Sequence, residues 1–493
     1  MRPLRPSSLP LPRRRAVLGA GGVVPALAAL ARPAAATAAP AAPSPVPSPG
    51  RRADPEPLPS DAAVAREVRA EFLHSWQGYR QAAWGYDEVR PVSGGRHDFF
   101  AAGHSFGLSA VEALDTLWVM ELDEEVAQAA DWIEAHLDPV ADVDMPVFES
   151  VIRLVGGLLA GYLCTGRPEL LTRCRELTDR LLPAFTASPT GIPYTRVNLR
   201  TGAVAGTAPP LAEIGSNVAE FGLLSRLTGD SRYVDAAKRA YRAVLERRSS
   251  LDLLGTTLHT ETGQWLDDVS CAPNPPVDSF HEYLQVGGEL LDDRELRDWY
   301  RLLTDAVLRH QLVEQDGLSW FRQVGAQDGR PRGTNQSELG SFYAGLLAKG
   351  GDLATARSYY RSWTALLDRH PVLPEQLDFA TGEVRSARND LRPEYANAAF
   401  DLWRLTGDEE YKRTAYRYFD ALRTHLRVPG GYTVAEDVTG SPMRLGDLTP
   451  GYWFAENPKY LYLMFAAAPR FDYARGLLST EGKILRGAVR PGA

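Results

Sequence analysis

Apolar residues recur at helical spacing through most of the chain after residue 60. One stretch holds five of them on this spacing: Val151, Leu154, Val155, Leu158 and Leu159. Steps of three and four residues place such side chains on one face of an α-helix. We therefore predict a chain made mainly of amphipathic helices, with strands confined to loops such as residues 191–204 and 431–438.

Short polar turns, 43 to 63 residues apart, divide the helical stretches into pairs. Seven are found, at residues 122–124, 165–167, 228–230, 291–293, 350–352, 406–408 and 468–469. Glycine supplies the left-handed backbone that stops a helix, and Asp or Pro starts the next. Units of about 60 residues are longer than those of common helical solenoids. The pattern predicts an all-α fold, an (α/α)7 barrel of seven helical hairpins with short β-hairpins in its loops, forming one domain over residues 61–493.

The N-terminal region is typical of an exported protein. Residues 1–39 hold Arg13-Arg14-Arg15, an apolar run from Ala16 to Ala31 and small residues after it, as in a twin-arginine signal. An uncleaved N-terminal anchor is the alternative. Residues 40–60 are rich in proline and predict an extended linker. Because no later apolar run has the length of a membrane span, we expect a bacterial protein that is secreted or cell-surface associated, without a span once the signal is removed.

The charge of the remaining chain limits its partners. Residues 1–53 carry eight arginines and no acid, so residues 54–493 hold 46 basic and 62 acidic side chains, a net charge of −16. A body this acidic argues against nucleic acid as the main partner and suits a neutral substrate or a cation. Three cysteines allow at most one disulfide. Cys164 and Cys174 lie in one predicted hairpin, where they either pair or remain free thiols.

Acidic residues stand near the start of each predicted inner helix. They are Glu112, Asp115, Glu149, Glu213, Asp278, Glu338, Glu394 and Glu456. The helix dipole alone would favour an acid at any one of these positions. As a set, however, they converge on one rim of a barrel, and Arg153 and Arg392 lie beside two of them. Paired carboxyl groups with arginines and aromatic residues are typical of glycoside hydrolysis, in which one carboxyl protonates the leaving oxygen and another activates water or attacks the sugar.

A second motif points to different chemistry. Residues 103–107 read Gly-His-Ser-Phe-Gly, the pattern of the nucleophile elbow in α/β-hydrolases. That elbow needs a buried strand before it and alternating strands and helices around it. The flanking residues instead predict a loop followed by a helix. We therefore do not expect Ser105 to be a nucleophile.

Seven blocks of residues, in order from about residue 70 to 483, resemble glycoside hydrolase family 47. This family comprises the class I α-1,2-mannosidases and their endoplasmic-reticulum degradation-enhancing relatives. The blocks are residues 103–108 with 114–117, 148–158, 211–221, 278–283, 391–394, 455–462 and 479–481.

The resemblance implies an (α/α)7 barrel with Ca²⁺ at its base and hydrolysis with inversion. Carried onto this chain, Glu149 is the general acid acting through a water, Glu394 the general base and Asp278 the third catalytic carboxylate. Thr480 binds calcium through its hydroxyl and carbonyl oxygens, as the oxygen preference of this ion allows. Further residues line the sugar site or hold calcium-bound waters: Arg153, Glu220, Glu282, Arg392, Glu456 and Glu481.

Some positions depart from the family pattern. Asn397 replaces the usual acid three residues after the base, Glu338 replaces a histidine common in the processing mannosidases, and Gly482-Lys483 stand where the family has Ala-His. The leading hypothesis is an exported, monomeric, calcium-dependent exo-α-1,2-mannosidase that acts on mannose-rich glycans. The alternatives are a weak or inactive glycan-binding protein on the same barrel, and an α/α-barrel enzyme for another linkage.

Overall fold

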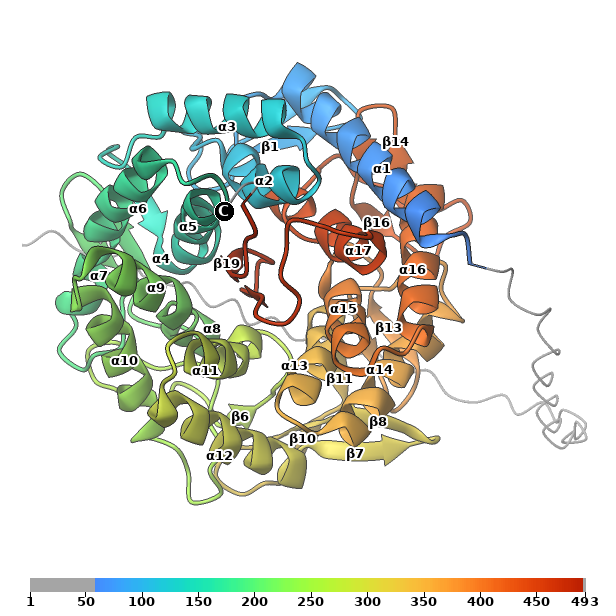
Figure 1. Cartoon of the computed structure of the whole chain (residues 1–493). Helices are drawn as coiled ribbons and strands as arrows, with labels where there is room; N and C mark the ends of the chain where they lie inside the picture. Colours follow the sequence, from blue (N-terminus) through green and yellow to red (C-terminus); the bar gives the residue numbers. More distant parts are fainter. Residues whose placement is uncertain (1–57, 491–493) are drawn as a thin grey trace, which may run out of the picture. The chain divides into compact units, whose positions relative to one another are not determined.

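Two concentric rings of helices make up residues 58–490, the part of the chain that the computed structural model describes (Figure 1). The predicted export signal and the predicted linker as far as residue 57 lie outside the described residues. The inner helices are α2 Leu108–Val119, α5 Gly156–Thr165, α9 Val218–Thr228, α11 Asp278–Leu290, α13 Tyr343–Lys349, α15 Glu394–Thr406 and α17 Asn457–Phe465. The outer helices are α1 Asp61–Ala82, α3 Asp123–His136, α6 Pro168–Leu181, α10 Arg232–Leu245, α12 Arg294–His310, α14 Leu353–Leu367 and α16 Glu410–Leu426.

The two rings differ in how their residues are buried. All 12 residues of α2 are buried, as expected of a helix enclosed on every side. In α12 the largest buried side chains follow a single face: Leu296, Tyr300, Leu303 and Val307. An outer helix therefore needs one apolar stripe, whereas an inner helix is apolar nearly all round.

Six of the predicted turns join an inner helix to the outer helix that follows it. Gly166 and Gly407 end α5 and α15 with φ of 77° and 69°, in the left-handed region that favours glycine. Asp293 and Asp352 begin α12 and α14, and their side chains accept hydrogen bonds from backbone N–H groups three residues later. The helix-pair pattern predicted from the sequence is therefore confirmed for these six hairpins.

The seventh hairpin differs from the prediction. No outer helix follows the turn at residues 468–469 within residues 58–490; instead the chain forms the strands β18 Leu477–Leu478 and β19 Ile484–Arg486. The outer partner of α17 is α1, which packs along it. Pairing the first helix with the last leaves no open edge in the ring, and local periodicity carries no signal for a contact between segments so distant in sequence.

Short antiparallel strands occupy the loops, as predicted. Three three-stranded sheets are formed, by β3 Asp144–Pro146, β4 Arg196–Asn198 and β5 Val204–Ala205; by β6 Val269–Ser270, β9 Gln323–Gly325 and β10 Pro331–Gly333; and by β11 Asn335–Ser337, β12 Gln376–Asp378 and β13 Glu383–Ser386. Two-stranded hairpins are β1 Glu88–Arg90 with β2 Gly95–His97, β7 Leu312–Gln315 with β8 Leu318–Phe321, β14 Arg427–Val428 with β15 Gly431–Tyr432, and β16 Ala435–Asp437 with β17 Arg444–Leu445. All of these lie between the end of an outer helix and the start of the next inner one, so they build one common face of the barrel.

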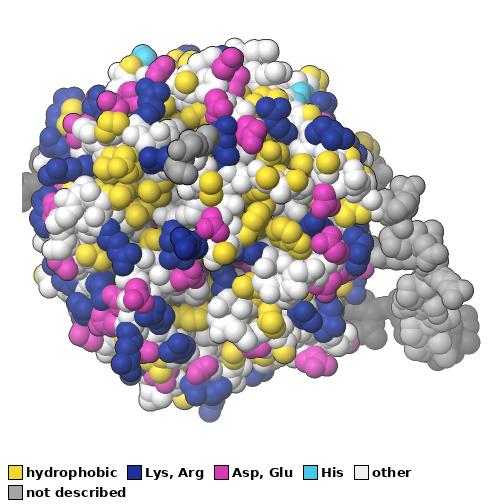
Figure 2. Space-filling model, in the orientation of Figure 1, with side chains coloured by type: hydrophobic (Ala, Val, Ile, Leu, Met, Phe, Trp, Pro, Cys, Tyr) yellow, Lys and Arg dark blue, Asp and Glu magenta, His cyan; other side chains and the backbone are white. Residues whose placement is uncertain are grey.

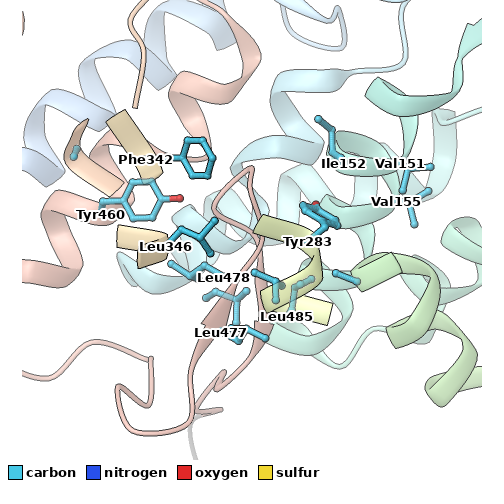
Figure 3. Packing of buried hydrophobic residues seen from close by; sticks show 14 of the residues in the cluster. Val151, Ile152, Val155, Tyr283, Phe342, Leu346, Tyr460, Leu477, Leu478 and Leu485 are labelled. Atoms are coloured by element: carbon cyan, nitrogen blue, oxygen red, sulfur yellow. The ribbon is translucent and has the colours of Figure 1, made fainter. Parts of the chain in front are cut away.

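The last hairpin, β18–β19, lies inside the inner ring (Figure 1). Leu477, Leu478 and Leu485 belong to the main hydrophobic core, which also contains Tyr283 and Tyr460 (Figure 3). Two fully buried lysines, described next, hold the loop between the two strands. The hairpin therefore occupies the barrel axis from one end.

Each of these lysines pairs with an acid of α2. Lys459 Nζ lies 2.7 Å from Asp115 Oδ2 and donates to the Gly482 carbonyl over 2.6 Å. Lys483 Nζ donates to the Glu112 carboxylate. Both lysine side chains are inaccessible to solvent, so these charges are compensated within the core.

One continuous helical run, Val147–Thr165, is as long and apolar as a membrane span. It combines α4 Val147–Glu149, the π-helical stretch η1 Ser150–Val155 and α5, and its most apolar 18-residue window has a mean hydropathy of 1.6. Glu149 and Arg153 interrupt the apolar sequence of this run. In the structure 78% of its most apolar window is buried, which matches its position in the inner ring.

The three cysteines are buried free thiols. The alternative of a Cys164–Cys174 disulfide is therefore not realised in the structure. Burial raises the pKa of the Cys164 thiol well above its usual range, as expected for a thiol that would have to ionise in an apolar environment.

Charges of both signs are interspersed over the face shown in Figure 2. Several pair across neighbouring outer helices. Arg242 of α10 lies 2.7 Å from Glu295 of α12, and Arg167, at the start of α6, lies 2.6 Å from Glu134 of α3. Because these pairs are partly exposed, each adds little stability.

Candidate active site

A cavity of about 340 Å³ opens where the inner helices begin. Asp278 and Glu394 are the first residues of α11 and α15, and Glu456 directly precedes α17. Thr480 and Glu481 come from the loop between β18 and β19. Nine of the ten predicted site residues line this cavity: Glu149, Arg153, Asp278, Glu282, Arg392, Glu394, Glu456, Thr480 and Glu481. The structure thus brings them together, while the role of each stays a prediction.

Glu220 is the exception. It is fully buried and does not line the cavity. Its Oε1 accepts a hydrogen bond of 2.7 Å from the Tyr283 hydroxyl, and its Oε2 has no partner within residues 58–490. Burial raises the pKa of Glu220 to about 8. Its carboxyl therefore lies in the wall behind the cavity, near Glu282 and Glu481.

Arg153 links three carboxylates. Its Nε donates to Glu149 Oε2 over 2.6 Å, and its Nη1 lies 2.5 Å from Glu481 Oε2 and 3.4 Å from Glu112 Oε1. The guanidinium also lies 5.4 Å from the Tyr452 ring centroid, within cation–π range. Burial disfavours its charge, but the three acids outweigh this and raise its pKa. Arg153 therefore holds the predicted acid against the tip of the β18–β19 hairpin.

Arg392, whose guanidinium lies 5.7 Å from the centroid of the same Tyr452 ring, also pairs with a carboxylate. Its Nε and Nη2 donate to the two oxygens of Glu375, both over 3.2 Å. Glu375 was not among the predicted residues, because it lies in a loop and no sequence pattern links it to Arg392. Tyr452, which lies between Arg153 and Arg392, was also missed.

Other cavity residues carry weaker sequence signals. Glu213 belongs to the predicted ring of acids but received no role; it lines the cavity, and burial, followed by repulsion from Glu149, raises its pKa to about 7. Apolar side chains, among them those of Phe148, Ile152 and Phe342, also line the cavity. A mixed wall of this kind is typical of sugar and small-molecule sites.

Burial shifts the acid–base properties of the cavity carboxyls. It raises the pKa of Glu394 to about 8, although Arg392 opposes the shift. It raises the pKa of Asp278 to about 6 and that of Glu481 to about 7. Burial and the nearby Glu481 raise the pKa of Glu456. Carboxyls with different proton affinities in one site are what general acid and general base roles require.

The positions that depart from the family pattern lie in different places. Asn397 lines the cavity. Glu338 does not: it is fully buried behind the wall, where it contacts Asn389 and Tyr418. Only the first of these two substitutions therefore changes the surface that a ligand would meet.

The Gly-His-Ser-Phe-Gly segment is a structural loop. Ser105 donates a hydrogen bond of 2.5 Å to Asp98, and Asp87 accepts bonds from the backbone N–H groups of Phe106 and Leu108. None of these residues lines the cavity. The loop delivers the chain into α2, and the expectation that Ser105 is no nucleophile stays a prediction.

The residues around Thr480 fit a bound cation. Thr480 contacts Glu282, and Glu394 Oε2 is buried without a partner in the described part of the chain. No three acidic, His or Cys side chains of residues 58–490 converge on one metal position. An ion here would therefore be held by Thr480 and by waters that the surrounding carboxylates orient.

Known proteins resemble this chain over most of its length. Alpha-mannosidase I MNS5 of Arabidopsis thaliana is 33% identical, covering 82% of this chain and 73% of that protein. ER degradation-enhancing alpha-mannosidase-like protein 2 of Mus musculus is 31% identical, covering 83% and 71%. The solved structure of the alpha-1,2-mannosidase from Trichoderma reesei has a TM-score of 0.78 at 25% identity, covering 87% of this chain and 99% of that one.

With the barrel and its acidic cavity, these similarities define the protein as a glycoside hydrolase. The sequence model of glycosyl hydrolase family 47 matches residues 71–487. The chain therefore belongs to that family.

Proposed function

We propose that the protein is a calcium-dependent, inverting exo-α-1,2-mannosidase that releases terminal mannose from mannose-rich glycans. The observation that carries the proposal is that nine of the predicted residues meet in one cavity, which the loop of the axial β18–β19 hairpin helps to line through Thr480 and Glu481. A cavity blocked at its inner end accepts the end of a glycan chain rather than its middle. The printed activities of the relatives supply the sugar and the linkage.

The geometry suggests distinct roles for the carboxyls. Glu149 is held by Arg153 beside the cavity opening, with 29% of its side chain exposed, which suits an acid that protonates the leaving oxygen through a water. Glu394 has a buried oxygen without a partner in residues 58–490, which suits a base that takes a proton from the attacking water. Asp278, at the start of α11, would orient the sugar between them.

Calcium would supply positive charge and oxygen coordination for sugar hydroxyls and waters. Thr480 would bind it, and Glu282, Glu456 and Glu481 would orient its waters. Arg153 and Arg392 would keep the cavity carboxylates in place through the pairs described above.

The first test is mannose release from α-1,2-mannobiose by the purified protein, with and without EDTA. NMR of the first product identifies its anomer, because inversion yields β-mannose and retention yields α-mannose. EDTA-sensitive release of β-mannose is expected. Absence of release with calcium present would contradict the proposal.

A glycan-binding protein without turnover is the second candidate. It is favoured by Asn397, an amide in the cavity at a position where the family usually has an acid. Calorimetry with mannobiose distinguishes the two: binding without released mannose at any calcium concentration supports this candidate. Release from α-1,3- or α-1,6-linked mannobiose would instead indicate another linkage.

We further propose that the protein is exported through its N-terminal signal and acts as a monomer. The support is the Arg13-Arg14-Arg15 segment followed by an apolar run. Replacing Arg13, Arg14 and Arg15 by Gln is expected to leave the protein inside the cell, as measured by fractionation. Light scattering of the purified protein tests the monomer.

A further inference from the structure

A tight turn over residues 389–394 delivers Glu394 into the cavity. Leu391 has φ of 60°, a left-handed conformation that a branched side chain rarely adopts. The Asn389 side chain holds it by accepting a hydrogen bond of 2.9 Å from the Leu391 N–H. Asn457 adds bonds to the carbonyls of Leu391 and Arg392, over 2.9 and 3.2 Å. Such a backbone persists only where its surroundings impose it.

The carboxyl of Glu394 depends on this turn for its position. Its Oε2 is buried and receives no hydrogen bond from residues 58–490. The side chain is therefore placed by the backbone that precedes α15. Whatever holds the turn determines where the predicted base stands.

Glu338 lies behind the turn and contacts it at two points. Its Oε2 accepts a hydrogen bond of 3.0 Å from Asn389 Nδ2, and its Oε1 lies 3.4 Å from the Tyr418 hydroxyl oxygen. Tyr418 in turn donates to the Arg392 carbonyl over 2.5 Å. A hydroxyl has one proton to donate, and the carbonyl takes it. The Tyr418 hydroxyl therefore has no second proton for Glu338, and a neutral Glu338 would supply the proton across the 3.4 Å that separate the two oxygens.

The charges around Glu338 favour its neutral form. The titratable groups that reach it are Glu375 before β12, Asp390 and Arg392 of the turn, Glu394 of α15 and Tyr418 of α16. Arg392 already donates two hydrogen bonds to Glu375, so an ionised Glu338 would add an uncompensated charge. Burial, followed by repulsion from Glu375 and Glu394, raises the pKa of Glu338 well above its usual range.

We propose that Glu338 is a positioning residue that, as a neutral carboxylic acid, bridges Asn389 and Tyr418 and so fixes the turn that presents Glu394. The proposal rests on the proposed function, in which Glu394 is the base. Glu338 does not touch the cavity, so its effect passes through the backbone of residues 389–394.

The first experiment compares Glu338→Gln with Glu338→Ala in mannose release. A glutamine amide accepts from Asn389 and donates to Tyr418, as the neutral acid does. Glu338→Gln is therefore expected to keep kcat within about twofold of the wild type. Glu338→Ala frees the turn and is expected to lower kcat by about 10- to 100-fold with KM within about threefold, because small misplacements of a catalytic group carry costs of this size. Equal losses in both variants, or unchanged kcat in Glu338→Ala, would overturn the proposal.

The pH profile of kcat separates the neutral form from the ionised one. An ionised Glu338 would repel the Glu394 carboxylate and raise its pKa, so its replacement by Gln would move the acid limb to lower pH. A neutral Glu338 predicts that the acid limb of Glu338→Gln coincides with that of the wild type. A shift of about half a pH unit or more contradicts neutrality.

Two tyrosine variants provide a matched control for loss of a buried hydrogen bond. Tyr418→Phe removes the hydroxyl that joins Glu338 to Arg392. Tyr359→Phe removes a buried hydroxyl that donates to Gln336 over 3.0 Å. Gln336 lies two residues before Glu338, and this hydrogen bond does not involve the turn over residues 389–394. Similar losses in Tm are expected, but only Tyr418→Phe should lower kcat. Equal kcat values would show that the network serves stability alone.

An infrared measurement of the protonation state of Glu338 tests this proposal independently of the proposed function. The difference spectrum of wild type minus Glu338→Gln should contain the carbonyl band of a neutral carboxylic acid at neutral pH, and a carboxylate band in its place would overturn the proposal. This result does not depend on turnover. If the wild type releases no mannose, the proposed function fails while the spectrum still decides the state of Glu338.

Discussion

Glu149 and Arg153 form the pair at the cavity on which turnover should depend most directly. We expect Glu149→Gln to lower kcat by about 10²- to 10⁴-fold, the usual contribution of general acid catalysis. The fold should persist, because Arg153 keeps its contacts with Glu481 and Glu112. Mannose release and thermal unfolding measure the two effects. Near-wild-type turnover in this variant would exclude Glu149 as the acid.

At the residue scale, the sequence located most of the cavity but not all of it. Acids at the starts of inner helices were predictable, because equivalent positions in a helical repeat share one rim. Glu375 and Tyr452 were not, since their contacts with Arg392 arise only when loops of different repeats meet. Glu220, from a family motif, is buried and does not line the cavity, so its predicted role in the sugar site or in holding calcium-bound waters stays a prediction.

At the scale of elements, the β18–β19 hairpin depends on its two buried lysines. Lys483→Met would remove the closer of the two cations that pair with Glu112 in the core and leave only the 3.4 Å contact with Arg153. Removal of one partner from a buried ion pair typically costs about 3–5 kcal/mol of unfolding free energy. The loop carrying Thr480 and Glu481 should also shift, so mannose release should fall. Urea unfolding and activity of the variant measure both effects.

Lys238→Met is the matched control for this variant. Lys238 pairs with Asp293 and Glu295 between outer helices, where 17% of its side chain is exposed. We expect a cost of about 1 kcal/mol, because water replaces the lost partner. Equal costs for the two variants would mean that Lys483 is not an internal anchor.

Helix pairs were the elements that the sequence predicted best. Apolar periodicity and the glycine and aspartate turns identified six hairpins within a few residues of their ends. The pairing of α1 with α17 was missed, because both helices look like ordinary amphipathic helices and nothing local marks them as partners. The role of β18–β19 as an axial plug was likewise invisible, since its strands are two and three residues long.

At the scale of the whole molecule, the acidic cavity should make stability depend on pH and calcium. Burial raises the pKa of Glu220 and Glu394 to about 8 and that of Glu213 to about 7, against 4.5 for an ordinary glutamate. The native state therefore binds more protons than the unfolded state between these values. The stabilisation that these three groups contribute is complete below about pH 4.5, where they are protonated in both states. It is lost as pH rises through their native pKa values of about 7 to 8.

For the calcium-free protein we therefore expect Tm to fall from about pH 5 to pH 8. Added calcium should raise Tm more at pH 8 than at pH 5, because a cation that binds the native state stabilises it and prefers ionised neighbours. Thermal scans at both pH values, with EDTA or with calcium, provide the measurement. A Tm that rises with pH in EDTA would contradict the raised pKa values that burial gives these carboxyls.

The closure of the ring by α1 and α17 also has a consequence for biosynthesis. During translation from the N-terminus, α1 emerges before every other helix of residues 58–490, and its partner α17 emerges nearly 400 residues later. Until then the apolar stripe of α1 and the inward faces of the growing arc have no lasting cover, and contacts this distant in sequence form slowly. The growing chain is therefore most prone to aggregate just before completion, and the final segment, which brings Thr480 into the cavity, is also the one that ends this exposure.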